Sequence, residues 1–215
     1  MNLKSDIMKN SITIVALLLT TLSFAQDQYT KGMQKAFSLW SEGKSIEAAN
    51  MFERISTVEQ DNWLPYYYVA QINTIVSFGE KDEKKLKQQL DKAQEFIDIA
   101  KAISPDNPEI MVQQAMTHTA WIAFDGATYG MTLSGKVAAL YAKAEQLAPD
   151  NPRVVFSKAE WDMGSARYFG QDITPYCADV ERSLELFANF KAESNFHPSW
   201  GADRAKATLE NCGKK

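Results

Sequence analysis

The chain has 215 residues, of which 45% are hydrophobic, and its formal net charge at pH 7 is −4. An acidic chain without a stripe of Lys and Arg is a poor candidate for binding nucleic acid or anionic lipid, because basic residues dominate both interactions. The chain has two histidines, no Gly-rich phosphate loop and no Gly-x-Ser-x-Gly sequence, so we expect no enzyme, no catalytic residue, no metal and no cofactor.

The first 25 residues have the composition of a secretory signal peptide. Two lysines precede an apolar run of 11 residues, Ile12–Leu22, and Ser23 and Ala25 are the small residues of a cleavage site. A membrane span needs about 20 apolar residues, so we expect a cleaved signal over residues 1–25. The mature chain, residues 26–215, is then expected in the periplasm or outside a Gram-negative bacterium, without membrane insertion.

The first predicted element of the mature chain is a helix hairpin. Apolar residues recur every three or four positions over residues 28–42, and again from Ile46 to Ile55. Glu42-Gly43-Lys44 interrupts the pattern. Two amphipathic helices joined by a short turn form an antiparallel hairpin.

One sequence phrase then occurs three times. Asp61-Asn62, Asp106-Asn107 and Asp150-Asn151 recur at spacings of 45 and 44 residues. Asn is a preferred N-cap residue, and Pro108 and Pro152 suit the first helical position. Each phrase therefore predicts the start of a helix, and the regular spacing predicts a helical repeat array.

Each of the later units is predicted to be a hairpin, and a capping helix is predicted to follow them. In the third unit a loop, Asp125–Gly135, is expected between the two helices, and it overlaps the first two residues of the second helix. The stretch Glu193–Pro198 breaks the helical pattern, and Trp200–Cys212 is predicted to be a polar capping helix. The predicted second helices are Asp82–Ile103, Ser134–Ala148 and Pro175–Lys191.

Small and aromatic residues recur at fixed spacings in the hairpins, and in two of the three sets a proline follows them. The sets are Ala36, Ala48, Phe52 and Ile55; Ala93, Ile97, Ala100 and Pro105; and Val137, Tyr141, Ala144 and Pro149. This pattern resembles the tetratricopeptide repeat (TPR). The resemblance implies an all-α, right-handed solenoid of about four antiparallel helix hairpins plus a C-terminal capping helix. Its repeats are expected at residues 28–60, 61–105, 106–149 and 150–192, with the cap at 198–212. These repeats of about 44 residues are longer than the 34 of a TPR, and HEAT-like repeats are the second interpretation.

The resemblance also implies a binding surface. In such arrays the first helices of successive hairpins line a concave face, which would bind a protein or a peptide of unknown identity. The alternative for each of these side chains is a place in the core. The positions carried over from the family are Tyr67, Gln71, Thr74, Glu109, Val112, Met116, Thr119, Arg153, Phe156, Glu160 and Met163.

The predicted loop Asp125–Gly135 adds a second hypothesis. Insertions on one face of a solenoid often form its binding face. We therefore expect Trp121, Tyr129 and Met131 to form part of a ligand-contacting lip. The alternative is that the loop folds back and fills the enlarged hairpin.

Both cysteines, Cys177 and Cys212, lie in the part of the chain that is expected to be exported. In an oxidising compartment such a pair more often forms a disulfide than a metal or catalytic site. A disulfide would close a loop of about 36 residues and stabilise the fold by roughly 3–4 kcal/mol. Free buried thiols are the alternative.

Two other functions stay open. A small-ligand binder, for example of saccharides, would use Trp63, Trp121 and Trp161 as stacking platforms. A hydrolase or metal enzyme would use His118 with carboxylates such as Asp125 and Glu160, although a core histidine is the simpler interpretation of His118. The sequence specifies neither the partner nor the oligomeric state.

Overall fold

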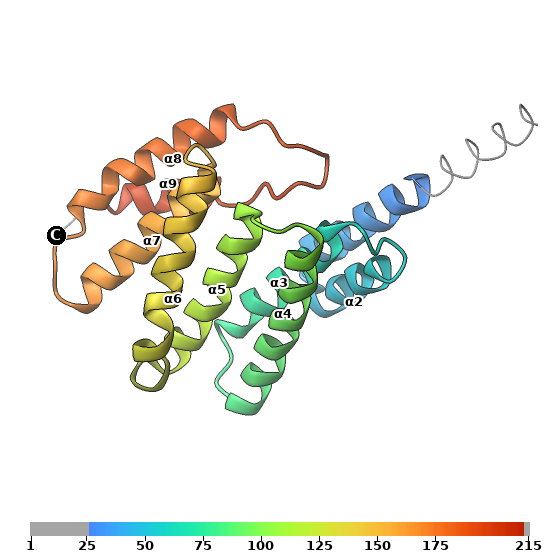
Figure 1. The fold of residues 1–215 in the computed structure, drawn as a ribbon, viewed down its shortest axis with the longest axis horizontal. Helices are drawn as coiled ribbons and strands as arrows, with labels where there is room; N and C mark the ends of the chain where they lie inside the picture. Colours follow the sequence, from blue (N-terminus) through green and yellow to red (C-terminus); the bar gives the residue numbers. More distant parts are fainter. Residues whose placement is uncertain (1–25, 213–215) are drawn as a thin grey trace, which may run out of the picture. The chain divides into compact units, whose positions relative to one another are not determined.

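The computed structural model describes residues 26–212, and within that range it contains helices and connecting segments but no strand (Figure 1). The chain divides into two compact units, residues 1–60 and 61–215, which are described separately. None of the described helices is both long and apolar enough to cross a membrane. The predicted signal peptide lies outside the described residues, and the predicted domain and repeat boundaries remain predictions.

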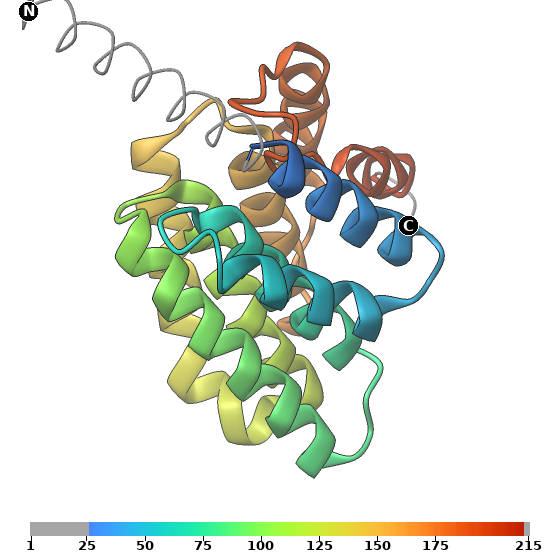
Figure 2. The ribbon, with the colours of Figure 1, turned by 90° about the vertical axis from the view of Figure 1, so that its right-hand side faces the viewer.

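The first unit is a helix hairpin. Residues 26–41 are helical, and α2 spans Ser45–Ser56; the two helices run in opposite directions (Figure 2). Gly43 has a φ of +78° in the turn between them, a conformation that favours glycine. The rings of Phe37 and Phe52 meet edge to face with their centroids 5.2 Å apart. The hairpin predicted for this part of the chain is therefore confirmed.

The second unit contains three further hairpins and a C-terminal helix, and their arrangement can be followed in Figures 1 and 2. The hairpins are α3/α4, α5/α6 and α7/α8, and a short 3-10 helix, η1, precedes α8. This architecture confirms the prediction of an all-α, TPR-like fold. The elements are α3 (Trp63–Ser77), α4 (Glu83–Ile103), α5 (Pro108–Phe124), α6 (Gly126–Leu147), α7 (Pro152–Tyr168), η1 (Thr174–Tyr176), α8 (Cys177–Asn189) and α9 (Ala202–Glu210).

The repeated Asp-Asn phrase starts the first helix of each of these hairpins. The side-chain oxygens of Asn62, Asn107 and Asn151 accept hydrogen bonds from the backbone N–H groups two residues further on, at 3.1, 2.9 and 2.9 Å. Each side chain thus satisfies at least one N–H group that has no partner within its helix. The predicted helix starts are confirmed.

The predicted loop Asp125–Gly135 is wrong, because α5 ends at Phe124 and α6 begins at Gly126, so that only Asp125 lies between the two helices. The carboxylate of Asp125 accepts hydrogen bonds from the backbone N–H groups of Ala127 and Thr128, both at 3.1 Å. This N-cap starts the helix. The glycines of its exposed first turns weaken it by only about 1 kcal/mol each relative to alanine, so the cap and the packing of the rest of α6 outweigh them.

The C-terminal segment, which we define as residues 190–212, leaves α8 and returns to the start of the second unit before α9 forms (Figure 1). The hydroxyl of Tyr68, in α3, donates a 2.8 Å hydrogen bond to the carbonyl oxygen of Phe196. Helix α9 then packs beside α7 and α8, where Ala205 joins a buried cluster with Phe156 and Val180. The segment therefore spans the unit from its first hairpin to its last.

The predicted disulfide holds the end of this segment. Cys177, the first residue of α8, is bonded to Cys212, with the two Cα atoms 5.9 Å apart. The described part of the chain contains no free cysteine. The pair thus fastens the last helix to the array, as the sequence predicted.

Candidate functional site

The structure places most of the predicted partner-binding residues inside the molecule. Met116, Thr119, Trp121, Tyr129 and Glu160 are half-buried, and Met131 is 95% exposed. The remaining positions are buried, and a buried side chain offers no surface to a partner. The buried residues are Tyr67, Gln71, Thr74, Glu109, Val112, Arg153, Phe156 and Met163.

Part of this burial comes from the C-terminal segment, which covers the face predicted to be concave. The indole Nε1 of Trp200 donates a 2.8 Å hydrogen bond to the hydroxyl of Tyr67 in α3. The Arg204 Nε of α9 lies 2.6 Å from Glu160 Oε1 in α7. Predicted groove residues on the first and last hairpins of the unit therefore contact a polypeptide, and that polypeptide is the chain's own C-terminal segment.

Other predicted groove residues pack between helices. The hydroxyls of Thr74 in α3 and Thr117 in α5 are 2.9 Å apart, and Gln113 Nε2 donates to Thr74 Oγ1 at 2.9 Å. These contacts place Thr74 at the interface between two hairpins. Here the helical register differs from the one expected from the family spacing, because a rotation by one residue exchanges a groove position for a core position.

A buried ionic cluster lies under the C-terminal segment. Arg153 Nε and Nη2 donate to the two carboxylate oxygens of Glu109 at 2.7 and 2.6 Å, and Asn151 Nδ2 donates to the same carboxylate at 2.6 Å. His197 Nε2 lies 3.5 Å from Glu109 Oε1 and has no hydrogen-bond partner within the described residues. The Arg153 guanidinium lies over the Phe190 ring, with its Cζ atom 4.4 Å from the ring centroid.

This arrangement keeps Glu109 ionised. Burial alone would raise the pKa of its carboxyl group, but the neighbouring His197 imidazole, the Arg153 guanidinium and the Asn151 amide lower that pKa below its ordinary value. A buried carboxylate paired with a bidentate arginine is a stable structural unit when its remaining lone pairs are also satisfied. Glu109 and Arg153 thus join α5 to α7 and support the segment above them.

A pocket of about 530 Å³ opens beside this cluster. Both copies of the Pro-Asp-Asn-Pro phrase contribute to it, so we call it the repeat-loop pocket. The aromatic rings of Trp63 and Phe190 and the imidazole of His197 also line it. Its other lining residues are Ser104, Asn107, Pro108, Glu109, Ala148, Pro149, Asp150, Asn151, Lys191 and Glu193.

The residues of the predicted lip lie on α5 and α6. The rings of Trp121 and Tyr129 are in contact, with their centroids 4.8 Å apart, whereas Met131 extends into solvent. Helical residues form this surface, because the predicted loop is absent. Its role in ligand binding remains a prediction.

The residues considered for an enzyme make contacts within the fold. Asp125 caps α6 and Glu160 pairs with Arg204. His118 is half-buried beside Gln114, and burial, with the nearby Lys136 as a smaller cause, lowers its pKa. Within residues 26–212 no three His, Cys, Asp or Glu side chains gather closely enough to hold a metal ion.

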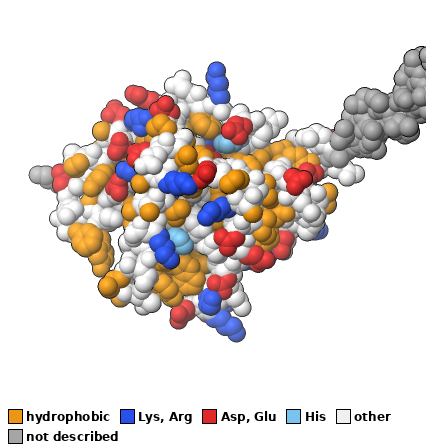
Figure 3. All heavy atoms as spheres, in the orientation of Figure 1, with side chains coloured by type: hydrophobic (Ala, Val, Ile, Leu, Met, Phe, Trp, Pro, Cys, Tyr) orange, Lys and Arg blue, Asp and Glu red, His pale blue; other side chains and the backbone are white. Residues whose placement is uncertain are grey.

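Charged side chains of both signs are distributed over the visible face of the described residues, with hydrophobic side chains between them (Figure 3). That face carries no uninterrupted basic area of the kind that tracks a nucleic-acid backbone.

Sequence reasoning assigned no binding role to several residues of the site, among them Phe190, His197 and Trp200. Phe190 lies at the end of the predicted helix Pro175–Lys191, His197 lies in the stretch that breaks the helical pattern, and Trp200 follows that stretch; the family resemblance assigned no groove position to any of them. The one available signal was their composition, because aromatic residues in a non-helical, polar stretch need a surface on which to be buried.

No protein-family model matches the chain, and no curated protein matches it. Among solved structures, the HusA haemophore from Porphyromonas gingivalis is similar over 86% of this chain and 92% of that chain, with a TM-score of 0.76 and 22% sequence identity. TTC0263, a thermophilic TPR protein of Thermus thermophilus, aligns over 86% of this chain and 98% of that chain, with a TM-score of 0.41 and 13% identity. The first similarity shows that the two proteins share a fold.

Proposed function

We propose that the protein is an exported, non-catalytic binding protein that holds a small ligand in the repeat-loop pocket. The pocket carries this proposal: its volume of about 530 Å³ lies within the range of small-molecule sites, roughly 300–1,000 Å³. Trp63 and Phe190 supply apolar surface, and Asn107, Asn151 and Lys191 supply polar groups that can orient a ligand.

The C-terminal segment favours a small ligand over a protein partner on the predicted concave face. A second polypeptide on that face would have to break the contact between Trp200 and Tyr67 and the ion pair between Arg204 and Glu160. The pocket, by contrast, needs no such displacement. The small-ligand interpretation, with Trp63 as its stacking platform, therefore ranks first.

A tetrapyrrole is the ligand class that we propose to test first. The fold similarity to a haemophore supports this choice. A flat, largely apolar ring system with carboxylate groups would use the aromatic rings of Trp63 and Phe190, the ammonium group of Lys191 and the imidazole of His197. Saccharides, which also stack on tryptophan, are the second class.

Export is part of the proposal. The signal-like sequence of residues 1–25 supports it, and so does the disulfide between Cys177 and Cys212, because disulfides persist in oxidising compartments.

The test is a titration of the mature chain, residues 26–215, with haemin, followed by the Soret absorption band. We expect saturable binding that Trp63→Ala and Lys191→Glu each weaken at least tenfold. Lys206→Glu, an equal charge change at an exposed residue of α9, should leave the affinity unchanged. Binding that survives Trp63→Ala and Lys191→Glu would refute this pocket as the site. An absence of haemin binding would refute the tetrapyrrole, and a glycan array would then test the saccharide alternative.

A protein partner is the second candidate function, favoured by an exposed aromatic pair. Tyr168 and Phe169, at the end of α7, are 80% and 71% exposed, and their ring centroids are 5.1 Å apart. Exposed apolar surface of this kind marks interaction sites. A crosslinking pull-down from the host's periplasm should capture a protein with the wild-type chain and lose it with Tyr168→Ser/Phe169→Ser. Equal capture by both chains would exclude this surface.

A further inference from the structure

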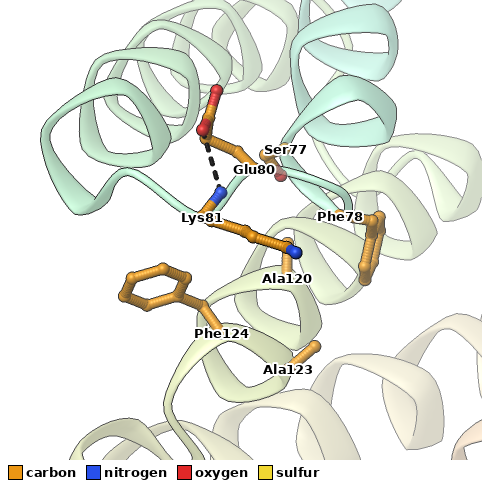
Figure 4. Close-up of a pocket in the computed structure, with 7 residues that line it drawn as sticks. All are labelled: Ser77, Phe78, Glu80, Lys81, Ala120, Ala123 and Phe124. Atoms are coloured by element: carbon orange, nitrogen blue, oxygen red, sulfur yellow. Dashed lines mark hydrogen bonds between the residues drawn. The ribbon is translucent and has the colours of Figure 1, made fainter.

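Figure 4 shows a second pocket, of about 290 Å³. It is lined by residues at the C-terminal end of α5, whereas residues at the N-terminal end of α5 line the repeat-loop pocket. Phe78, which follows α3, and Phe124, the last residue of α5, form its apolar walls. Ala120 and Ala123 lie on α5 between these walls, and their small side chains leave the space open. We call it the Phe78–Phe124 pocket.

One cation faces the space between the two phenylalanines. Figure 4 shows the side chain of Lys81 lying across the pocket between Phe78 and Phe124. Lys81 is exposed and forms no ion pair with any described residue. Its ammonium group is therefore available to pair with an anionic group of a ligand that enters the pocket.

The neighbouring carboxylate of Glu80 is ionised, but it forms no ion pair with Lys81 among the described contacts. Glu80 Oε1 accepts hydrogen bonds from the backbone N–H groups of Lys81 and Asp82 at 2.8 and 2.9 Å, and these bonds lower its pKa. In Figure 4 its carboxylate points away from the two phenylalanines. Ser77, the remaining polar side chain of the pocket, donates its hydroxyl proton to the Thr74 carbonyl oxygen at 2.7 Å, so it can only accept a hydrogen bond from a ligand.

We propose that the Phe78–Phe124 pocket binds an amphiphilic carboxylate of medium chain length. Its alkyl chain lies over the alanines of α5 between the two phenylalanine rings, and its carboxylate pairs with the ammonium group of Lys81. A volume of about 290 Å³ is at the lower end of the range for small-molecule sites, which suits a ligand of about eight carbon atoms and excludes a tetrapyrrole. This site shares no residue with the repeat-loop pocket and stands independently of the proposed function.

Octanoate is the probe, and octanamide is its uncharged counterpart. Binding to residues 26–215 is measured by isothermal titration calorimetry and by amide chemical-shift changes in NMR spectra. We expect Lys81→Gln to weaken octanoate binding about tenfold and to leave octanamide unchanged, because one charge contact is lost. Lys81→Arg should restore the octanoate affinity. Lys84→Gln, a nearby charge change outside the pocket, is the matched control.

A second variant tests the apolar half of the site. Ala123 is exposed on the last turn of α5, so Ala123→Leu fills the pocket in a helix that tolerates leucine, and it should abolish the binding of both probes. Three results would each overturn the proposal: no octanoate binding at millimolar concentration, an equal loss from Lys81→Gln and Lys84→Gln, or unchanged binding by Ala123→Leu.

Discussion

The indole Nε1 of Trp200 donates a 2.8 Å hydrogen bond to the hydroxyl of Tyr67, across 133 positions of sequence. This bond joins the C-terminal segment, just before α9, to α3, which is the first helix of the second unit. Tyr67 is 1% exposed. Burial, and to a smaller degree the nearby Glu109 carboxylate, raises the pKa of Tyr67 well above its ordinary value, so its hydroxyl stays protonated at every physiological pH.

Trp200→Phe is expected to destabilise the protein by roughly 1–3 kcal/mol, because the buried Tyr67 hydroxyl loses its donor. Tyr67→Phe removes the hydroxyl itself, and the double variant removes both partners. Urea denaturation of all four proteins gives the coupling energy. We expect the double variant to be less destabilised than the sum of the single variants, and additive losses would show that the hydrogen bond contributes nothing.

The Glu109–Arg153 pair predicts a large cost for removing one partner. Arg153→Met leaves a carboxylate that is 1% exposed without its cation, and breaking such a buried pair costs about 3–5 kcal/mol. Glu109→Gln/Arg153→Met, which removes both charges, should recover much of this loss. Thermal unfolding measures all the variants.

The matched control for that pair is Arg204→Met. The distance from Arg204 Nε to Glu160 Oε1 is also 2.6 Å, but the Arg204 side chain is 72% exposed. Exposed ion pairs contribute less than about 1 kcal/mol to stability. If Arg153→Met and Arg204→Met had equal effects, the burial of the Glu109–Arg153 pair would have no energetic consequence.

The lowered pKa of Glu109 predicts a pH dependence of stability. Its pKa in the folded state lies below that in the unfolded state, so the unfolded chain binds more protons between the two values and stability rises with pH there. The contribution is complete above the unfolded-state pKa, about 4.3, and is lost as the pH falls through the folded-state value. The free energy of unfolding, measured between pH 3 and pH 7, should vary less in Glu109→Gln than in the wild type, and parallel curves would contradict the prediction.

The sequence predicted features that form between residues close together in the chain, and it did not predict contacts between residues far apart in the chain. The caps at Asn62, Asn107 and Asn151 are local, because each side chain bonds a backbone group two or three residues away, and they were predicted correctly. The Asp125 cap is equally local, but the nearby glycines outweighed it in the sequence interpretation. The Trp200–Tyr67 contact is not local, and no repeat position indicated where the C-terminal segment would lie.

The candidate site shows the same limit. The family spacing predicted that Tyr67 and Glu160 face a partner, whereas in the structure they bond Trp200 and Arg204 of the chain's own C-terminal segment. It also placed Thr74 on a surface, whereas Thr74 bonds Thr117 in the core. Spacing identifies a helical face to within about one residue, and one residue separates core from groove.

Removal of the disulfide should destabilise the protein by roughly 3–4 kcal/mol, as expected for a loop closed across 35 positions. Cys177→Ala/Cys212→Ala should therefore unfold at a lower urea concentration than the wild type. A reductant should lower the wild-type midpoint toward that of the double variant and leave the double variant unchanged. If the wild type did not respond to the reductant, the bond would have no part in holding α9.

The three capping asparagines allow a comparison within one protein. Replacing an Asn cap by Ala costs about 1 kcal/mol, and Asn62→Ala and Asn107→Ala should each lose about that amount. Asn151 also donates a 2.6 Å hydrogen bond to the buried Glu109 carboxylate, and hydrogen bonds to charged groups contribute about 1.5–3 kcal/mol. Asn151→Ala should therefore be the most destabilising of the three in urea denaturation, and its excess loss should disappear in a Glu109→Gln/Arg153→Met background. Equal losses at all three positions would show that the ionic cluster does not depend on the cap that borders it.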